Sequence, residues 1–149
     1  MDARLDMTRT APGAYNAMLA LQGTVNKSGL EHTLLELVKL RASQLNGCAF
    51  CIAKHARDAV RHGISQERMH LLDAWRETLL YSARERAALA WTEALTFVTQ
   101  GHAPDEVYLQ VRQQFSEQET AWLTFAIATI NAWNRLAIGM RTPPQLDAA

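Results

Sequence analysis

The feature that most constrains this chain is its shortage of residues that interrupt helices. Only 7 glycines and 4 prolines occur among 149 residues, and alanine, leucine, glutamate, glutamine and arginine dominate the rest. These five residue types favour helix, and runs of β-branched residues, which favour strands, are absent. The sequence therefore predicts an all-α fold in which about six or seven helices pack as a single domain spanning residues 1–149.

Helix-ending and helix-capping signals divide the chain into these helices. We expect helices over residues 13–26 and 33–45, and then over the segments CAFCIAKHARDAVRHG and SQERMHLLDAW, which begin at residues 48 and 65. Capping boxes and a proline open the remaining helices: Ser82 with Glu85, Pro104, and Ser116 with Glu119. The segment before residue 13 is expected to be an irregular arm.

The distribution of charge and hydrophobicity excludes several classes of partner. Fifteen basic and fifteen acidic residues are mixed along the chain, so there is no electrostatic footprint for nucleic acid or an anionic membrane. The N-terminus lacks the apolar stretch of a secretory signal. The most apolar segment, residues 121–140, contains Asn131, Asn134 and Arg135, and it predicts the central helix of the core or a subunit interface. We expect a cytoplasmic protein.

The two cysteines lie only three residues apart, which closes too small a loop to stabilise a fold. The turn-forming pair Asn46-Gly47 precedes them and places Cys48 at the start of a helix. Cys48, Cys51 and His55 then stand at i, i+3 and i+7, within an arc of about 60° on one helix face. Three reactive side chains therefore share one surface.

This arrangement suits thiol redox chemistry. A dithiol at this spacing can close to a disulfide within one turn, and the positive end of the helix dipole stabilises a thiolate there. His55 lies one turn beyond Cys51 and can take its proton. Glu36 is flanked by leucines and a valine, where a partly desolvated carboxylate becomes a better base and can orient His55.

Other interpretations of the same residues stay open. A CxxC pair also occurs in zinc sites, or as two buried cysteines that only pack in the core. Four zinc ligands are formally available: Cys48, Cys51, His55 and Glu36. Structural zinc sites usually bring a second paired motif, which this sequence lacks, so no metal is assigned. Glu36 also suits a surface ion pair with Lys39.

The remaining candidates are assigned no role in the chemistry. Three cations near the thiols, Arg41, Lys54 and Arg57, are expected on a solvated face. The histidines outside the cysteine motif are expected at the surface or at helix caps: His32, His62, His70 and His102. The four tryptophans are expected in the core or at an interface.

The run Glu36, Cys48, Cys51, His55, with eleven, two and three residues between them, resembles the signature of the alkylhydroperoxidase D-type proteins of the carboxymuconolactone decarboxylase superfamily. The surrounding segment LLELVKLRASQLNGCAFCIAKHARDAVRHG and the late NAWNRLAIGMR are similar to that family as well, so the resemblance covers residues 18–141.

The resemblance implies an all-helical fold that assembles into trimers or hexamers. It also implies a peroxidase cycle that reduces hydroperoxides and is reset by an external dithiol reductant such as a lipoyl protein, with no bound cofactor. By position, Cys51 resembles the peroxidatic cysteine and Cys48 the resolving one, whereas helix-end physics favours Cys48 as the more acidic thiol. His55 and Glu36 resemble the proton relay.

The chain departs from the family pattern at Phe50, where members with the full relay carry a second histidine. We therefore expect a thiol-dependent hydroperoxide reductase that cycles its CxxC pair. The alternatives are a disulfide oxidoreductase or redox sensor with little peroxidase activity, and a zinc-binding or structural assembly module. The superfamily also contains lactone-acid decarboxylases without a cysteine pair, and the intact CxxC argues against that branch.

Overall fold

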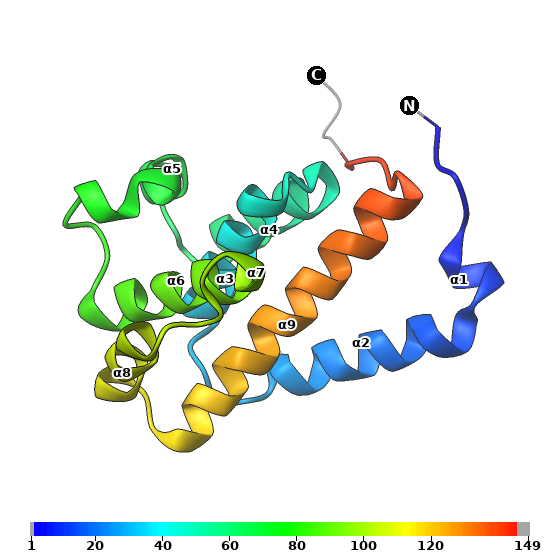
Figure 1. The fold of residues 1–149 in the computed structure, drawn as a ribbon. Helices are drawn as coiled ribbons and strands as arrows, with labels where there is room; N and C mark the ends of the chain where they lie inside the picture. The colour runs from blue at the N-terminus through cyan, green and yellow to red at the C-terminus, as the bar shows by residue number, and fades with distance from the viewer. Residues whose placement is uncertain (1, 146–149) are drawn as a thin grey trace.

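The computed structural model describes residues 2–145. In this part of the chain the secondary structure is entirely helical, which confirms the all-α prediction. Nine α-helices and one 3-10 helix, η1, form the bundle (Figure 1): α1 (Met7–Thr10), α2 (Pro12–Asn26), α3 (His32–Asn46), α4 (Ala49–Arg61), α5 (Gln66–His70), η1 (Leu71–Glu77), α6 (Ala83–Thr96), α7 (Val98–Gly101), α8 (Asp105–Gln114) and α9 (Glu117–Met140).

The helix count exceeds the predicted six or seven because three expected segments are divided or replaced. The arm before residue 13 contains α1, which begins where the Asp6 carboxylate accepts a hydrogen bond from the Thr8 backbone N–H at 3.0 Å. The expected helix from residue 65 gives way to η1, in which Leu72 and Trp75 are buried at the i, i+3 spacing that a 3-10 helix places on one side. A break at Phe97 separates α7 from α6.

The capping signals fall where the sequence places them. Ser82 with Glu85 and Ser116 with Glu119 form complete capping boxes at the starts of α6 and α9. Each pair satisfies backbone N–H groups that the first helical turn leaves unpaired, and thereby fixes where these two long helices begin.

The helix at the centre of the bundle is α3. It packs against α4, α6 and α9, and all of its residues from Leu34 to Ser43 are buried. Of the two expectations for residues 121–140, the central helix is wrong, because α9 covers one side of α3 and leaves Phe125 and Ile138 exposed. The subunit interface stays a prediction. A helix covered on every side has no solvent-facing stripe, so its polar side chains need partners inside the protein.

Two apolar clusters lie on either side of α3. Leu34, Leu35 and Val38 pack into one cluster with residues of α2, α6, α8 and α9. Leu37 and Leu40 pack into the other, with residues of α4, η1 and α6. Both clusters hold α3 in place, and its polar residues Glu36 and Lys39 are thereby fixed between them.

The two ends of the described chain lie on the same side of the bundle, beside the last turn of α9 (Figure 1). The Arg4 backbone N–H donates to the Met140 carbonyl at 2.9 Å, and its guanidinium donates to the Gly139 carbonyl at 3.0 Å. The N-terminal arm, residues 2–10, is thus fastened to the end of α9. Among residues 2–145, no helix combines the length and hydrophobicity that crossing a membrane requires.

Candidate functional site

The CxxC motif sits at the junction between α3 and α4. Gly47 ends α3 in the left-handed conformation (φ 67°, ψ 32°), which favours glycine because it has no Cβ. Cys48 is the N-cap of α4, and its Sγ accepts a hydrogen bond from the Cys51 backbone N–H at 3.3 Å. The prediction that Asn46-Gly47 places Cys48 at a helix start is confirmed.

Cys48 and Cys51 are joined in a disulfide, with their Cα atoms 5.3 Å apart. Both side chains are nearly inaccessible, at 1% and 3% exposure. They pack with Ala137 of α9, and Phe50 borders the same cluster. The disulfide is therefore closed off from bulk solvent on the α9 side.

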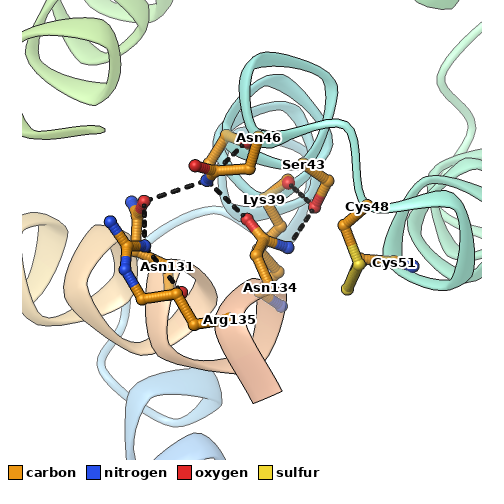
Figure 2. Close-up of a disulfide and its surroundings, with 9 residues drawn as sticks. Lys39, Ser43, Asn46, Cys48, Cys51, Asn131, Asn134 and Arg135 are labelled. Carbon is orange, nitrogen blue, oxygen red and sulfur yellow. Dashed lines mark hydrogen bonds between the residues drawn. A yellow bond between two sulfur atoms is a disulfide. The ribbon is translucent and has the colours of Figure 1, made fainter. Parts of the chain in front are cut away.

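A partly buried chain of hydrogen bonds ties the end of α3, just before the disulfide, to α9 (Figure 2). The Asn46 amide nitrogen donates to the Asn134 carbonyl oxygen at 2.9 Å and to that of Asn131 at 3.0 Å. The Asn134 amide donates to the Ser43 hydroxyl at 3.0 Å, and that hydroxyl donates to the Lys39 backbone carbonyl at 2.7 Å. These contacts hold the end of α3 in register with α9.

Glu36 and His55 meet between α3 and α4. The Glu36 Oε2 lies 2.9 Å from the His55 Nδ1, and both side chains are buried. Burial raises the pKa of Glu36, but the hydrogen bond from His55 and the charge of Lys39 outweigh it, and the pKa falls to about 2. The expectation that Glu36 becomes a better base is wrong: it is a fixed anion that orients the imidazole.

The ionised state of Glu36 determines the tautomer of His55. A carboxylate can only accept hydrogen bonds, so the His55 Nδ1 must carry the proton that it donates. Burial lowers the pKa of His55 below its ordinary 6.5, although Glu36 opposes this shift. His55 is therefore neutral at pH 7, with the lone pair of Nε2 available to accept a proton.

The second oxygen of Glu36 pairs with Lys39. Its Oε1 lies 2.9 Å from the Lys39 Nζ, which also donates to the Asn26 side-chain oxygen at 3.2 Å. Glu36 thus contacts both Lys39, the partner expected from the i+3 spacing, and His55, the partner expected from the family motif. The pair is buried, however, rather than lying at the surface.

The three cations expected on a solvated face differ from one another. Arg41 is buried and pairs with Asp73 and with Glu93, the latter at 2.9 Å, so the expectation is wrong for this residue. It is buried because α3 is enclosed on all sides. Lys54 is half exposed, and Arg57 donates to the Gln145 carbonyl.

A cavity of about 830 Å³ opens onto this site. Cys51 lines it and Cys48 does not, so only one residue of the pair borders the space in which a small molecule could bind. Its walls combine the polar side chains of Glu36, Lys39 and His55 with apolar and aromatic side chains: Leu5, Tyr15, Leu19, Phe50, Ile130, Trp133 and Leu136. The N-terminal arm and the end of α9 complete the walls.

The sequence assigns no role to His32 and His62, which are exposed as expected, and does not single out Asp58; all three line this cavity. Asp58 continues the face of α4 that carries His55, and it pairs with Lys54 at 2.5 Å and Arg61 at 3.2 Å. His32 and His62 stack with ring centroids 5.1 Å apart. The signal for Asp58 and His62 was available, since they stand at i+3 and i+7 from His55. His32 lies at the start of α3, so its position beside His62 could not be predicted from the spacing of residues within α4.

Metal-binding groups are also present in the cavity. Ligand atoms of Glu36, His55 and Asp58 lie within 4.8 Å of one another. Both cysteines are engaged in the disulfide, and each carboxylate already pairs with a cation of the protein, so a metal would have to displace these pairs. The four-ligand zinc hypothesis stays a prediction.

Residues 12–94, which contain Glu36, both cysteines and His55, match the family model described as the carboxymuconolactone decarboxylase family. The chain belongs to the carboxymuconolactone decarboxylase family. It is 38% identical to the uncharacterised protein YdfG of Bacillus subtilis over 94% of its own length and 95% of that protein's length. The family model thus covers more than half of the chain, and the similarity to YdfG extends over nearly all of it.

One solved structure places the chain among the alkylhydroperoxidase D-like members of this family. It is similar to ATU0492 of Agrobacterium tumefaciens, a protein of unknown function described as a candidate antioxidant defence protein AhpD. The identity is 39%, the TM-score is 0.95, and the match covers 98% of this chain and 100% of the other. The debrominase Bmp8 shares the fold at 20% identity, with a TM-score of 0.78 over 90% of this chain and 72% of Bmp8.

Proposed function

We propose that this protein is a thiol-dependent hydroperoxide reductase of the antioxidant type. The observation that carries the proposal is the position of Cys51. It is the one cysteine of the pair that lines the cavity, and His55, which Glu36 orients, lines the same cavity. This placement agrees with the role of peroxidatic cysteine that the family resemblance implies for Cys51.

The proposed cycle begins with the reduced pair. His55 takes the proton of the Cys51 thiol, and the thiolate attacks the terminal oxygen of a hydroperoxide. The S–O bond forms as the O–O bond breaks, which yields a sulfenic acid on Cys51 and an alkoxide that recovers the proton from His55. Cys48 then attacks the sulfenic sulfur, water leaves, and the disulfide seen in the structure results.

An external dithiol must reset this disulfide. The sulfurs are almost completely buried, so a folded protein could not bring its own cysteines against them without opening the site. A slender reductant that enters through the cavity fits better, and the dithiol on the flexible arm of a lipoyl protein has this shape. We propose such a protein as the partner, and a cytoplasmic homo-oligomer, a trimer or hexamer, as the working assembly.

Phe50 favours a second candidate function. It lines the cavity at the position where the full family relay has a histidine. A relay that lacks this second histidine has fewer groups to move protons, so a disulfide oxidoreductase or redox sensor that reacts slowly with peroxide is the alternative. Fast exchange with small disulfides together with slow oxidation by hydroperoxides would select this alternative.

The test is single-turnover oxidation of the reduced protein. Dithiol-reduced protein, freed of excess reductant, is mixed with tert-butyl hydroperoxide, and the loss of two hydrogen atoms is followed by intact mass. Cys51→Ser should abolish the reaction. Cys48→Ser should stop at the sulfenic acid, trapped with dimedone. If the reduced wild type is not oxidised, or if neither variant changes the reaction, the proposal fails.

A further inference from the structure

Lys39 is a buried cation in the wall of the same cavity. Its side chain is 6% exposed, whereas the other two permanent cations of the described cavity wall, Lys54 and Arg61, are 50% and 75% exposed and pair with Asp58. Burying an ammonium is strongly unfavourable unless partners inside the protein compensate for the lost hydration. The chain therefore maintains this charge next to Glu36 at some cost.

Two of the three N–H donors of the Lys39 ammonium have partners among the described residues. One contacts the Glu36 Oε1 at 2.9 Å and one the Asn26 Oδ1 at 3.2 Å. An ammonium carries three donors and no acceptor. The third donor has no partner in residues 2–145, and the side chain borders the cavity, so this donor is available to an oxygen of a bound molecule.

The proposed reaction creates an oxygen that needs such a donor. When the thiolate attacks, negative charge passes from sulfur to the oxygen that leaves as an alkoxide. A fixed cation in a water-poor site stabilises developing charge without reorganising at the moment of reaction. We propose that Lys39 is a further catalytic residue, whose ammonium donates a hydrogen bond to the leaving oxygen of the hydroperoxide. This inference rests on the proposed peroxidase function.

The protons and electrons balance without further reactants. The Cys51 sulfur loses two electrons to the peroxide, the S–O bond forms and the O–O bond breaks. The proton that His55 took from the thiol returns to the alkoxide, which leaves as an alcohol. Lys39 keeps its own proton throughout, so its contribution is a hydrogen bond and a charge.

The experiment compares oxidants with different leaving groups. An alkyl hydroperoxide releases a strongly basic alkoxide, whereas a peracid releases a weakly basic carboxylate that needs little help. Lys39→Met should slow oxidation by tert-butyl hydroperoxide on the order of 100-fold, the scale of losing one oxyanion donor. Oxidation by peracetic acid should fall by much less. Lys54→Met, which removes a cation from the same cavity, should preserve the wild-type ratio.

A purely structural role for Lys39 predicts something different. If Lys39 acts only by holding Glu36 and His55, its loss changes the formation of the Cys51 thiolate. Both oxidants, and alkylation by iodoacetamide, should then slow by the same factor. Equal slowing, or no slowing, overturns the inference while the peroxidase proposal stands. A wild type that alkyl hydroperoxides do not oxidise removes both.

A second pair of variants keeps the test valid if Lys39→Met does not fold. Removing one partner of a buried ion pair leaves an uncompensated charge, which is strongly destabilising. The double variant Glu36→Gln with Lys39→Met removes both charges. Its oxidant ratio is compared with that of Glu36→Gln alone, and the same selective loss with the alkyl hydroperoxide is expected. An unchanged ratio overturns the inference.

Discussion

Asn134→Ala tests how strongly the hydrogen bonds from α9 stabilise the end of α3, just before the disulfide. The Asn134 side chain is fully buried at 0% exposure and makes two hydrogen bonds, one to Ser43 and one from Asn46. Each bond contributes about 1 kcal/mol net, and deleting the amide leaves a small cavity. We expect Asn134→Ala to lower the free energy of unfolding by about 2 to 3 kcal/mol.

The expected loss of stability is moderate because Asn46 and Ser43, the two partners of Asn134, keep their other hydrogen bonds. The Asn46 amide still donates to the Ala42 carbonyl and to Asn131, and the Ser43 hydroxyl still donates to the Lys39 carbonyl. No donor is therefore orphaned in the variant, and the larger penalty of an unsatisfied buried donor does not arise. A loss above about 5 kcal/mol would contradict this account of the network.

Urea unfolding of the oxidised protein, followed by circular dichroism, measures the effect. Asn131→Ala is the matched control, because it lies on the same helix and contacts the same Asn46 but is only partly buried. A double-mutant cycle with Ser43→Ala should return a coupling of about 1 kcal/mol for the bond between Asn134 and Ser43. A destabilisation below about 0.5 kcal/mol, within the usual range of surface substitutions, would refute the reasoning.

Three further predictions concern the site. Because burial lowers the pKa of His55, the acidic limb of the pH profile of kcat/KM with hydroperoxide should lie below pH 6.5. Glu36 raises that pKa, so Glu36→Gln should move the limb to lower pH; a shift to higher pH contradicts the stabilisation of the imidazolium by Glu36. Phe50→His should accelerate oxidation by tert-butyl hydroperoxide, by up to about 100-fold if the second imidazole completes the relay; an unchanged stopped-flow rate argues against that role. Gly47→Ala should lower the free energy of unfolding in urea by about 1 to 2 kcal/mol, because Gly47 has φ 67°. The control is Gly13→Ala: Gly13 is exposed and lies within a helix at ordinary φ, so this change should stabilise the protein slightly.

The local features of this fold could be predicted because their signals lie within a few residues. The capping boxes at Ser82 and Ser116, the turn at Gly47 and the N-cap position of Cys48 each depend on backbone groups no more than four positions away. The shared face of Cys51 and His55 likewise follows from helix geometry. These features were predicted correctly because tertiary packing had little to change.

The electrostatic character of the site could not be predicted in this way. The polar residues of α3 give it the composition of a surface helix, yet α4, α6 and α9 enclose it and bury Lys39 and Arg41. The leucines around Glu36 suggested a raised pKa, because desolvation is the only effect visible in the local sequence. The opposing effect comes from His55, nineteen positions away, and from Lys39, and it lowers the pKa to about 2.

That low pKa also explains how a buried site could move a proton at little cost. With the pair reduced and His55 neutral, Lys39 and Glu36 cancel each other's charge and Cys51 is an uncharged thiol. After the proton moves, the new imidazolium and the new thiolate cancel as well, while Glu36 stays ionised and holds the imidazolium. The net charge of the four groups is therefore zero before and after the transfer. In a site of low dielectric constant, a net charge would be expensive, so in the proposed cycle this balance favours proton transfer from Cys51 to His55.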